Sequence, residues 1–361
     1  MKPGIHYSSD IDATYAPVVQ WATVRISLIL SVLCKLHCRQ VDFVQAFPQA
    51  NIDMPVYLRL PAGWTHVDEE GNNDYCLQLI KNLYGTKSGA RNWFLHLKEG
   101  LIQEGFKQSD VDPCLFLRKD CILVIYTDDT ILMGPSQETL LNTIKSLSTR
   151  FILKDEGEIN DFLGIRIERD VANGRVTLTQ PGLIQTILKD LNLTGSSEKV
   201  KPCETPATTI LHPDKDGPPR EESWNYQSVL GKLGFLALNT RPEIAFSVHQ
   251  CARFCNNPTL LHEKAMKRIG RYLASSPDKG ITFFPEPTGA LDAYCDADFA
   301  GRWNQAYAEL RETVLSRSGY SIHFCGCPVM WISKMQMEIA LSTTEAELMA
   351  LSQCLRDLIP L

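Results

Sequence analysis

The sequence lacks an excess of basic charge. Its 361 residues carry 36 Lys and Arg against 42 Asp and Glu, which gives a net charge of −6. Neither half is basic, since residues 1–190 carry 19 basic and 23 acidic side chains. Bulk charge therefore does not favour a nucleic-acid partner, and any contact with a polyanion must come from local basic patches.

Closely paired cysteines and long apolar runs are also missing. The twelve cysteines include no CxxC pair, so their spacing predicts buried reduced thiols instead of a zinc site. The apolar stretch 18–36 is interrupted by Arg25 and closes with Lys35 and Leu36, which predicts a buried helix and not a membrane span. We expect no secretory leader and an intracellular, cytoplasmic protein without a membrane partner.

Length and pattern predict several domains. Helical spacing follows the Gly- and Ser-containing turn in 83–105, a strand pattern covers 162–170, and Asn173-Gly174 predicts a hairpin turn. Breaks rich in Pro, Ser and Lys divide the chain. The predicted parts are residues 1–193, a linker at 194–222, a helical region at 223–283 and a third unit at 284–361.

An acidic pair lies at the tip of an apolar hairpin, ILVIYTDDTILM at 122–133. Asp128 and Asp129 repel each other unless solvent or a cation compensates their charges. Asp42 ends a further short strand, QVDFVQAF. Three carboxylates on neighbouring strands would suit Mg²⁺ and two-metal phosphoryl transfer. Spacing alone also allows an ordinary solvated turn, because acidic residues are common in turns.

Several motifs occur together in a fixed order. They are QVDFVQAF with VYLRLPAGW, LYGTKSGARNW, YTDD, DFLGIRIE, YQSVLGKLGFLALNTRPEIAFSVHQ, and YCDADFAG with ALSTTEAELMALS. With these motifs the chain resembles, over nearly its full length, the reverse transcriptase and ribonuclease H region of copia-type LTR retrotransposon Pol polyproteins. The resemblance implies an α+β fold: a right-hand-type polymerase palm of antiparallel sheet and helices, a helical thumb or connection region, and a partial ribonuclease H-like α/β domain.

The resemblance implies an RNA-directed DNA polymerase that uses Mg²⁺ or Mn²⁺. Asp42, Asp128 and Asp129 match its catalytic, metal-binding aspartates. The implied nucleotide-binding residues are Phe43, whose carbonyl would be a further metal ligand, Phe47, Lys87, Ser88 and Arg91. Phe47 matches the aromatic gate that excludes a 2′-hydroxyl, with plain core packing as the alternative. Ser88 replaces the usual Gln, a change that would weaken nucleotide contact.

Other motifs imply contacts with nucleic acid. DFLGIRIE resembles the hairpin that grips the primer strand. Lys264, Lys267, Arg268 and Arg271 recur at helical spacing, so they could follow a nucleic-acid backbone or form a solvated face. The implied partners are an RNA template, a DNA primer, deoxynucleoside triphosphates and other parts of a Gag–Pol polyprotein, in a cytoplasmic virus-like particle.

The third unit resembles the front of a ribonuclease H domain. Asp296 and Glu347 match two of its metal ligands, with Asp298 and Glu345 nearby. Two further aspartates would be needed. Because the sequence stops at Leu361, and Asp357 shares a predicted helix with Glu347, we do not expect ribonuclease H activity.

The family also has basic fingers strands before the motif at residues 5–19, and the sequence starts at about this motif. An alternative to the polymerase is therefore a catalytically inactive retrotransposon remnant or a domesticated fragment. Such a chain would at most bind nucleic acid.

Overall fold

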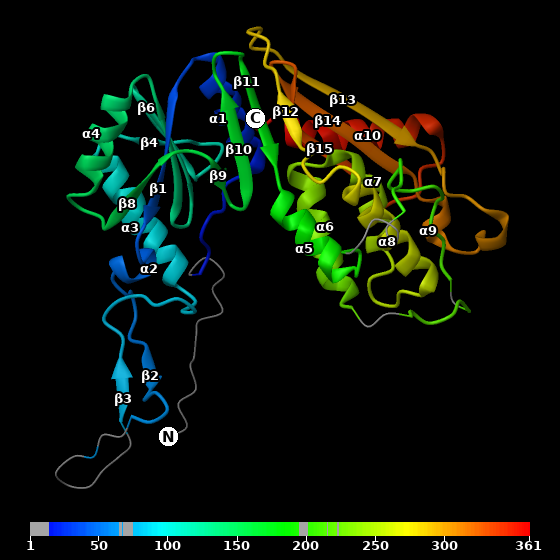
Figure 1. Ribbon diagram of the computed structural model, residues 1–361, viewed down its shortest axis with the longest axis horizontal. Helices are drawn as coiled ribbons and strands as arrows, with labels where there is room; N and C mark the ends of the chain where they lie inside the picture. The colour runs from blue at the N-terminus through cyan, green and yellow to red at the C-terminus, as the bar shows by residue number, and fades with distance from the viewer. Residues whose placement is uncertain (1–13, 65–66, 68–74, 195–200, 215, 222–223) are drawn as a thin grey trace. The chain divides into compact units, whose positions relative to one another are not determined.

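The computed structural model describes residues 14–64, 67, 75–194, 201–214, 216–221 and 224–361 (Figure 1). Contacts divide the chain into two compact units. Unit 1 contains residues 1–24 and 35–159, and unit 2 contains 25–34 and 160–361. The predicted boundaries at 193, 222 and 283 stay predictions. The motif at 5–19 lies largely outside the described residues, as does part of the predicted linker.

Unit 1 is built on a six-stranded antiparallel sheet with the order β4-β5-β6-β7-β1-β8. Strand β1, predicted from the QVDFVQAF motif, lies between two strands that come much later in the chain. Strands β2 and β3 pair with each other in a two-stranded antiparallel ribbon. Their bounds are β1 His37–Phe43, β2 Tyr57–Arg59, β3 Cys76–Gln78, β4 Lys107–Gln108, β5 Leu115–Arg118, β6 Cys121–Tyr126, β7 Asp129–Gly134 and β8 Leu153–Glu158.

Aromatic side chains join the sheet of unit 1 to its helices. The helices are α2 (Ala46–Gln49), α3 (Gly89–Gln103) and α4 (Gln137–Leu147). Phe43 of β1, Trp93 of α3 and Phe151 before β8 pack edge to face, with ring centroids 5.3 to 6.0 Å apart. All three rings are buried, and such edge-to-face pairs add to the stabilisation from burial alone.

Helix α1 (Trp21–Leu33) confirms the buried helix predicted around Arg25. Within unit 2, the Arg25 guanidinium donates hydrogen bonds to the carbonyls of Val329 and Leu238 at 2.7 and 2.5 Å. It also lies 4.2 Å from the ring centroid of Trp331. Burial lowers the pKa of Arg25 to about 9. Within the described ranges, no helix has the length and apolar character to cross a membrane.

The first part of unit 2 combines a four-stranded antiparallel sheet, in the order β12-β11-β10-β9, with helices whose apolar faces form a common core. The strand predicted at 162–170 is wrong as a single element. Leu163 and Gly164 adopt positive φ angles of 52° and 75°, which reverse the chain into the β9–β10 hairpin that the resemblance implied. The elements are β9 Asp161–Phe162, β10 Ile165–Asp170, β11 Arg175–Thr179, α5 Pro181–Asp190, α6 Tyr226–Asn239, η2 Pro242–Ile244, α7 Ala245–Ala252, α8 Leu260–Ala274 and β12 Ile281–Phe283.

The last part of unit 2 is a three-stranded antiparallel sheet in the order β13-β14-β15, packed against α10. The helix predicted to carry both Glu347 and Asp357 is confirmed as α10. Ser342 caps α10 by accepting a hydrogen bond from the Glu345 amide, while the Glu345 carboxylate accepts one from the Leu341 amide. The bounds are β13 Leu291–Asp298, η3 Gln305–Tyr307, α9 Arg311–Val314, β14 Arg317–Phe324, β15 Cys327–Met335 and α10 Thr343–Leu358.

A group of cations surrounds His249 of α7. Its Nδ1 lies 3.2 Å from Nη1 of Arg317, a buried residue of β14. Burial, followed by the positive charges of Arg317, Arg253, Arg302 and Lys334, lowers the pKa of His249 to about 4. The neutral imidazole is thus the form that the folded chain accommodates.

We expect acid to weaken unit 2 through His249. The unfolded pKa is about 6.5, above the folded value of about 4, so the stabilisation is complete above pH 6.5 and is lost as pH falls towards 4. After discounting for partial exposure, the loss is on the order of 1–2 kcal/mol. Urea unfolding at pH 7.5 and pH 5 measures it, and His249→Gln should lose less stability than the wild type. Equal losses would contradict the assignment.

Candidate active site

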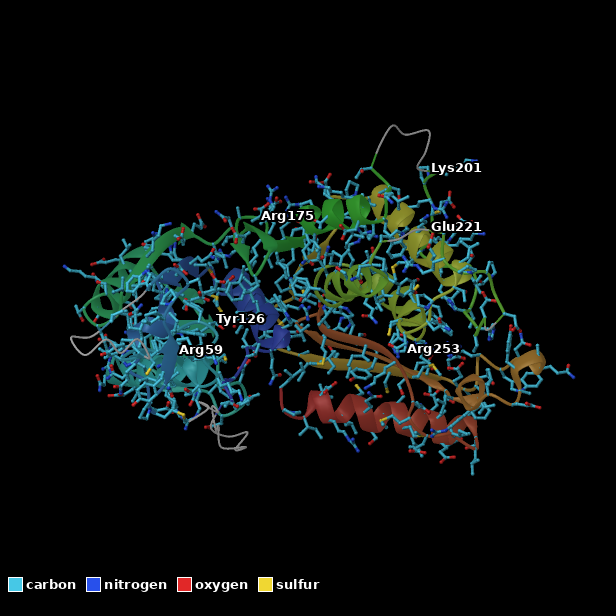
Figure 2. All side chains as sticks on the ribbon, turned by 90° about the horizontal axis from the view of Figure 1, so that it is seen from below. Arg59, Tyr126, Arg175, Lys201, Glu221 and Arg253 are labelled. Atoms are coloured by element: carbon cyan, nitrogen blue, oxygen red, sulfur yellow. The ribbon has the colours of Figure 1, made fainter. Side chains whose placement is uncertain are left out.

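The acidic pair lies where the sequence predicted it, at the turn between β6 and β7. Tyr126, labelled in Figure 2, ends β6, and Asp129 begins β7. Thr127 adopts a left-handed conformation with φ of 57°, which is strained for a β-branched residue. The buried Trp93 indole donates a hydrogen bond of 2.6 Å to the Thr127 carbonyl. This bond holds the strained turn against the core.

Strand β1 brings Asp42 to this turn. Asp42 pairs directly with Asp129 in the β1–β7 register, and the Phe43 amide donates to the Asp128 carbonyl at 3.1 Å. Side chains alternate along a strand, so Asp42 points away from the face on which Phe43 packs. The backbone therefore gathers the three predicted aspartates at one end of the sheet.

The charges at this end of the sheet are unbalanced. Burial raises the pKa of Asp42, the negative charges of Asp128 and Glu156 raise it further, and Lys154 lowers it. Lys154 lies opposite Asp42 on β8, and its ammonium is 2.7 Å from the Glu156 carboxylate. Sequence reasoning missed both β8 residues, because the segment LKDEGE has no apolar alternation that predicts a strand.

The donor atoms suit a hard divalent cation. Carboxylate oxygens are the ligands that Mg²⁺ and Mn²⁺ prefer, and Mg²⁺ commonly uses one or two carboxylates together with substrate phosphates. Among the described residues, no group of three or more His, Cys, Asp or Glu side chains could hold a metal ion. The structure therefore does not assemble the predicted site of three aspartate side chains. Asp42 and Asp128 are electrostatically coupled, and their binding of a metal stays a prediction.

An aromatic pair lies beside the aspartates. Phe47 of α2 stacks on Tyr84, with ring centroids 4.6 Å apart and planes at 18°. Burial and the negative charges of Asp128 and Asp42 raise the pKa of Tyr84. Tyr84 is part of the LYGTKSGARNW motif, but the site residues predicted from this motif were the polar Lys87, Ser88 and Arg91.

Those polar residues have mixed surroundings. Lys87 is exposed. Ser88 is only 3% exposed at the start of α3, so its predicted contact with a nucleotide is not supported. Arg91 lies 3.7 Å from the Asp53 carboxylate, which also accepts a hydrogen bond from Asn92 at 2.9 Å. Part of the predicted phosphate-binding charge is therefore already compensated within the chain.

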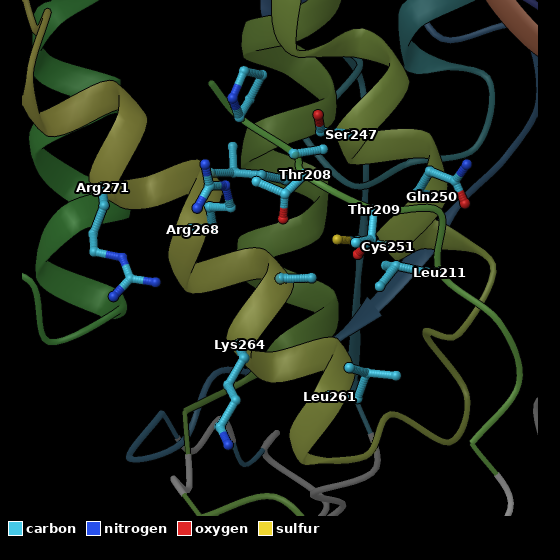
Figure 3. Close-up of a pocket in the computed structure, with 14 residues that line it drawn as sticks. Thr208, Thr209, Leu211, Ser247, Gln250, Cys251, Leu261, Lys264, Arg268 and Arg271 are labelled. Carbon is cyan, nitrogen blue, oxygen red and sulfur yellow. The ribbon is translucent and has the colours of Figure 1, made fainter. Parts of the chain in front are cut away.

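The predicted basic face on α8 is divided. Lys264, Arg268 and Arg271 line a cavity of about 240 Å³ with residues 206–211 and α7 (Figure 3). Arg268 donates to the Thr205 hydroxyl at 3.0 Å. Lys267 instead lies 3.2 Å from the buried Glu263 carboxylate. The four cations do not form one solvent-facing row, and their contact with nucleic acid stays a prediction.

The ribonuclease H-like residues Asp296 and Glu347 are both exposed. Cys295 pairs with Tyr320, whose hydroxyl donates to Asp357 on α10. Since neighbouring residues of a strand face opposite sides, Asp296 faces away from α10, which carries Glu347. The register thus gives no support to the predicted metal-binding pair.

Comparison with known proteins finds a reverse transcriptase family model and retrotransposon Pol polyproteins. The family model described as "Reverse transcriptase (RNA-dependent DNA polymerase)" matches residues 2–205. The retrovirus-related Pol polyprotein from transposon RE1 of Arabidopsis thaliana is 33% identical over 351 residues, covering 96% of this chain and 22% of the relative. The polyprotein from transposon TNT 1-94 of Nicotiana tabacum is 30% identical, with 97% and 26% covered. The chain thus spans about a quarter of the length of these relatives.

One solved structure, telomerase from Candida albicans with a fragment of telomeric RNA, is similar at 11% identity. The match covers 74% of this chain and 50% of the telomerase chain, with a TM-score of 0.27. This likeness is too low to carry an argument.

The fold and site define an α+β protein with an acidic centre at one end of an antiparallel sheet. Because the family model matches more than half of its length, the chain belongs to the reverse transcriptase (RNA-dependent DNA polymerase) family. The relatives confirm the predicted resemblance to copia-type retrotransposon Pol polyproteins.

We expect the acidic centre to reduce stability when no cation is bound. Asp42→Asn or Asp128→Asn removes one of two repelling charges and should raise the free energy of unfolding by about 0.5–1 kcal/mol. Urea unfolding at pH 7 in EDTA measures this change. Asp155→Asn is the matched control and should lower stability, because Asp155 forms a 2.7 Å ion pair with Arg39. Destabilisation by both site variants would contradict the expectation.

Proposed function

We propose that the chain is the polymerase region of a copia-type retrotransposon Pol polyprotein, and that it extends a DNA primer on an RNA template with deoxynucleotides. The observation that best supports this proposal is that β1–β7 pairing brings Asp42 to the Asp128–Asp129 turn. The chain that does so belongs to the reverse transcriptase family. Other parts of a Gag–Pol polyprotein and a cytoplasmic virus-like particle belong to the same proposal.

The carboxylates of Asp42 and Asp128 are the proposed holders of Mg²⁺ or Mn²⁺. When bound, such an ion offsets the repulsion between the carboxylates and steadies the charge of a triphosphate. Trp93 fixes the turn that carries Asp128 through the bond to the Thr127 carbonyl. Lys154, opposite Asp42, supplies a positive charge beside the phosphates.

The sugar of the incoming nucleotide is assigned to the aromatic pair. Phe47 would exclude a 2′-hydroxyl through its ring, as the family resemblance implies. Its half-buried ring lies in the short helix α2, which follows the strand of Asp42, and stacks on Tyr84. The coupling of Tyr84 to Asp42 and Asp128 supports the location of this pair at the nucleotide site.

Primer extension on poly(rA)/oligo(dT) with Mg²⁺ tests the proposal. Asp42→Asn and Asp128→Asn should each lower the rate by roughly 10²-fold or more, since a proposed metal ligand is lost. Asp120→Asn is the matched control, because Asp120 is also an aspartate at a β-turn of this sheet and pairs with Arg118. This variant should extend at nearly the wild-type rate.

Full activity of Asp128→Asn would overturn the metal assignment. A folded wild-type chain that does not extend the primer would favour the alternative of an inactive fragment. Retention of the same template–primer on a filter would then show whether that fragment binds nucleic acid.

A further inference from the structure

We infer that Tyr84 is a positioning residue for sugar selection: by stacking on Phe47 it fixes the ring that separates deoxynucleotides from ribonucleotides. This inference rests on the proposed function. It adds a second residue to the sugar-selecting surface, from a loop distant in sequence from Phe47.

The stack itself is well defined. Phe47 belongs to the four-residue helix α2, and Tyr84 lies in the loop that precedes α3. Their centroids are 4.6 Å apart and their planes meet at 18°. The Phe47 ring is only partly buried, so part of its surface is open to solvent. The parallel face of Tyr84 restricts the motion of this ring, and small displacements of a positioning group change reaction rates strongly.

The first turn of α3 also lies close to the Phe47 ring. A Cβ atom placed at Gly89 would lie 3.2 Å from Cδ2 of Phe47 and 2.6 Å from the Thr86 hydroxyl oxygen. Glycine therefore permits the first turn of α3 to approach the Phe47 ring closely. The LYGTKSGARNW motif thus stacks on Phe47 through Tyr84 and approaches it closely at Gly89.

The exposure of Tyr84 argues against a role in packing alone. Tyr84 is 53% exposed, whereas the core aromatics of the same unit, such as Trp93 and Phe43, are each 1% exposed. Its hydroxyl is coupled to Asp42 and Asp128. An exposed ring that stacks on the gate residue is placed to contact the sugar side of a bound nucleotide.

The test compares dTTP and UTP incorporation on poly(rA)/oligo(dT), measured as kcat/KM for each nucleotide. Tyr84→Phe keeps the stack and should retain the wild-type preference for dTTP within about threefold. Tyr84→Ala, and Tyr84→Leu, which keeps apolar bulk without a planar ring, should lower the preference by about tenfold through better use of UTP.

A double variant isolates the coupling. Phe47→Ala should lower the preference for dTTP more than Tyr84→Ala does, and adding Tyr84→Ala to Phe47→Ala should change it by less than about twofold, because the two residues act through one contact. Tyr57→Ala is the matched control. Tyr57 is 55% exposed on β2, and this variant should keep the wild-type preference.

Two results separate the inference from the proposed function. In the first, the wild type extends the primer, and folded Tyr84→Ala and Tyr84→Leu keep its preference for dTTP or lose kcat/KM equally for dTTP and UTP. This result would overturn the role of Tyr84 but not the proposed polymerase activity. Failure of the folded wild type to incorporate dTTP would overturn the proposed function and, with it, this inference.

Discussion

The pairing of β1 with β7 is the constraint on which the acidic centre depends. It places Asp42 opposite Asp129 and beside Asp128, and thereby concentrates like charges at one end of a sheet. Repulsion opposes this pairing, while buried strands and the edge-to-face cluster of Phe43, Trp93 and Phe151 favour it. The neighbouring ion pair of Arg39 with Asp155 connects β1 to β8. Packing in the core thus offsets the repulsion between the aspartates at the end of the sheet.

Helix α3 connects the parts of the candidate site. Trp93 holds the turn that carries Asp128, and Gly89 allows the close approach of Phe47. An asparagine network fixes the same region: Asn82 donates to the Asn51 carbonyl at 2.8 Å, and Asn92 donates to the Asn82 side chain at 3.2 Å. The turn, the Phe47 ring and the loop that carries Tyr84 are therefore held by one element.

Arginine in unit 2 shows why counting charges is a poor guide to partners. Arg241 is fully buried and donates to the Ser276 carbonyl and to Glu243. Arg302 is 3% exposed and donates to the Leu211 carbonyl. These guanidinium groups satisfy backbone carbonyls inside the fold, so they are not available to a nucleic acid. The basic charge that remains at the surface is smaller than the composition suggests.

The sequence by itself determined the features that depend on near neighbours in the chain. These include the hairpin at the Asp128–Asp129 pair, the helices with regular apolar spacing, the Asn173-Gly174 turn and, through the order of its motifs, the family. The tertiary structure decided which distant residues meet. Lys154 and Glu156 join Asp42 through a strand without apolar alternation, Tyr84 stacks on Phe47, and Ser88 is buried at the start of α3. Local patterns report the energetics of a single element, whereas these contacts arise from pairing and packing between elements far apart in the chain.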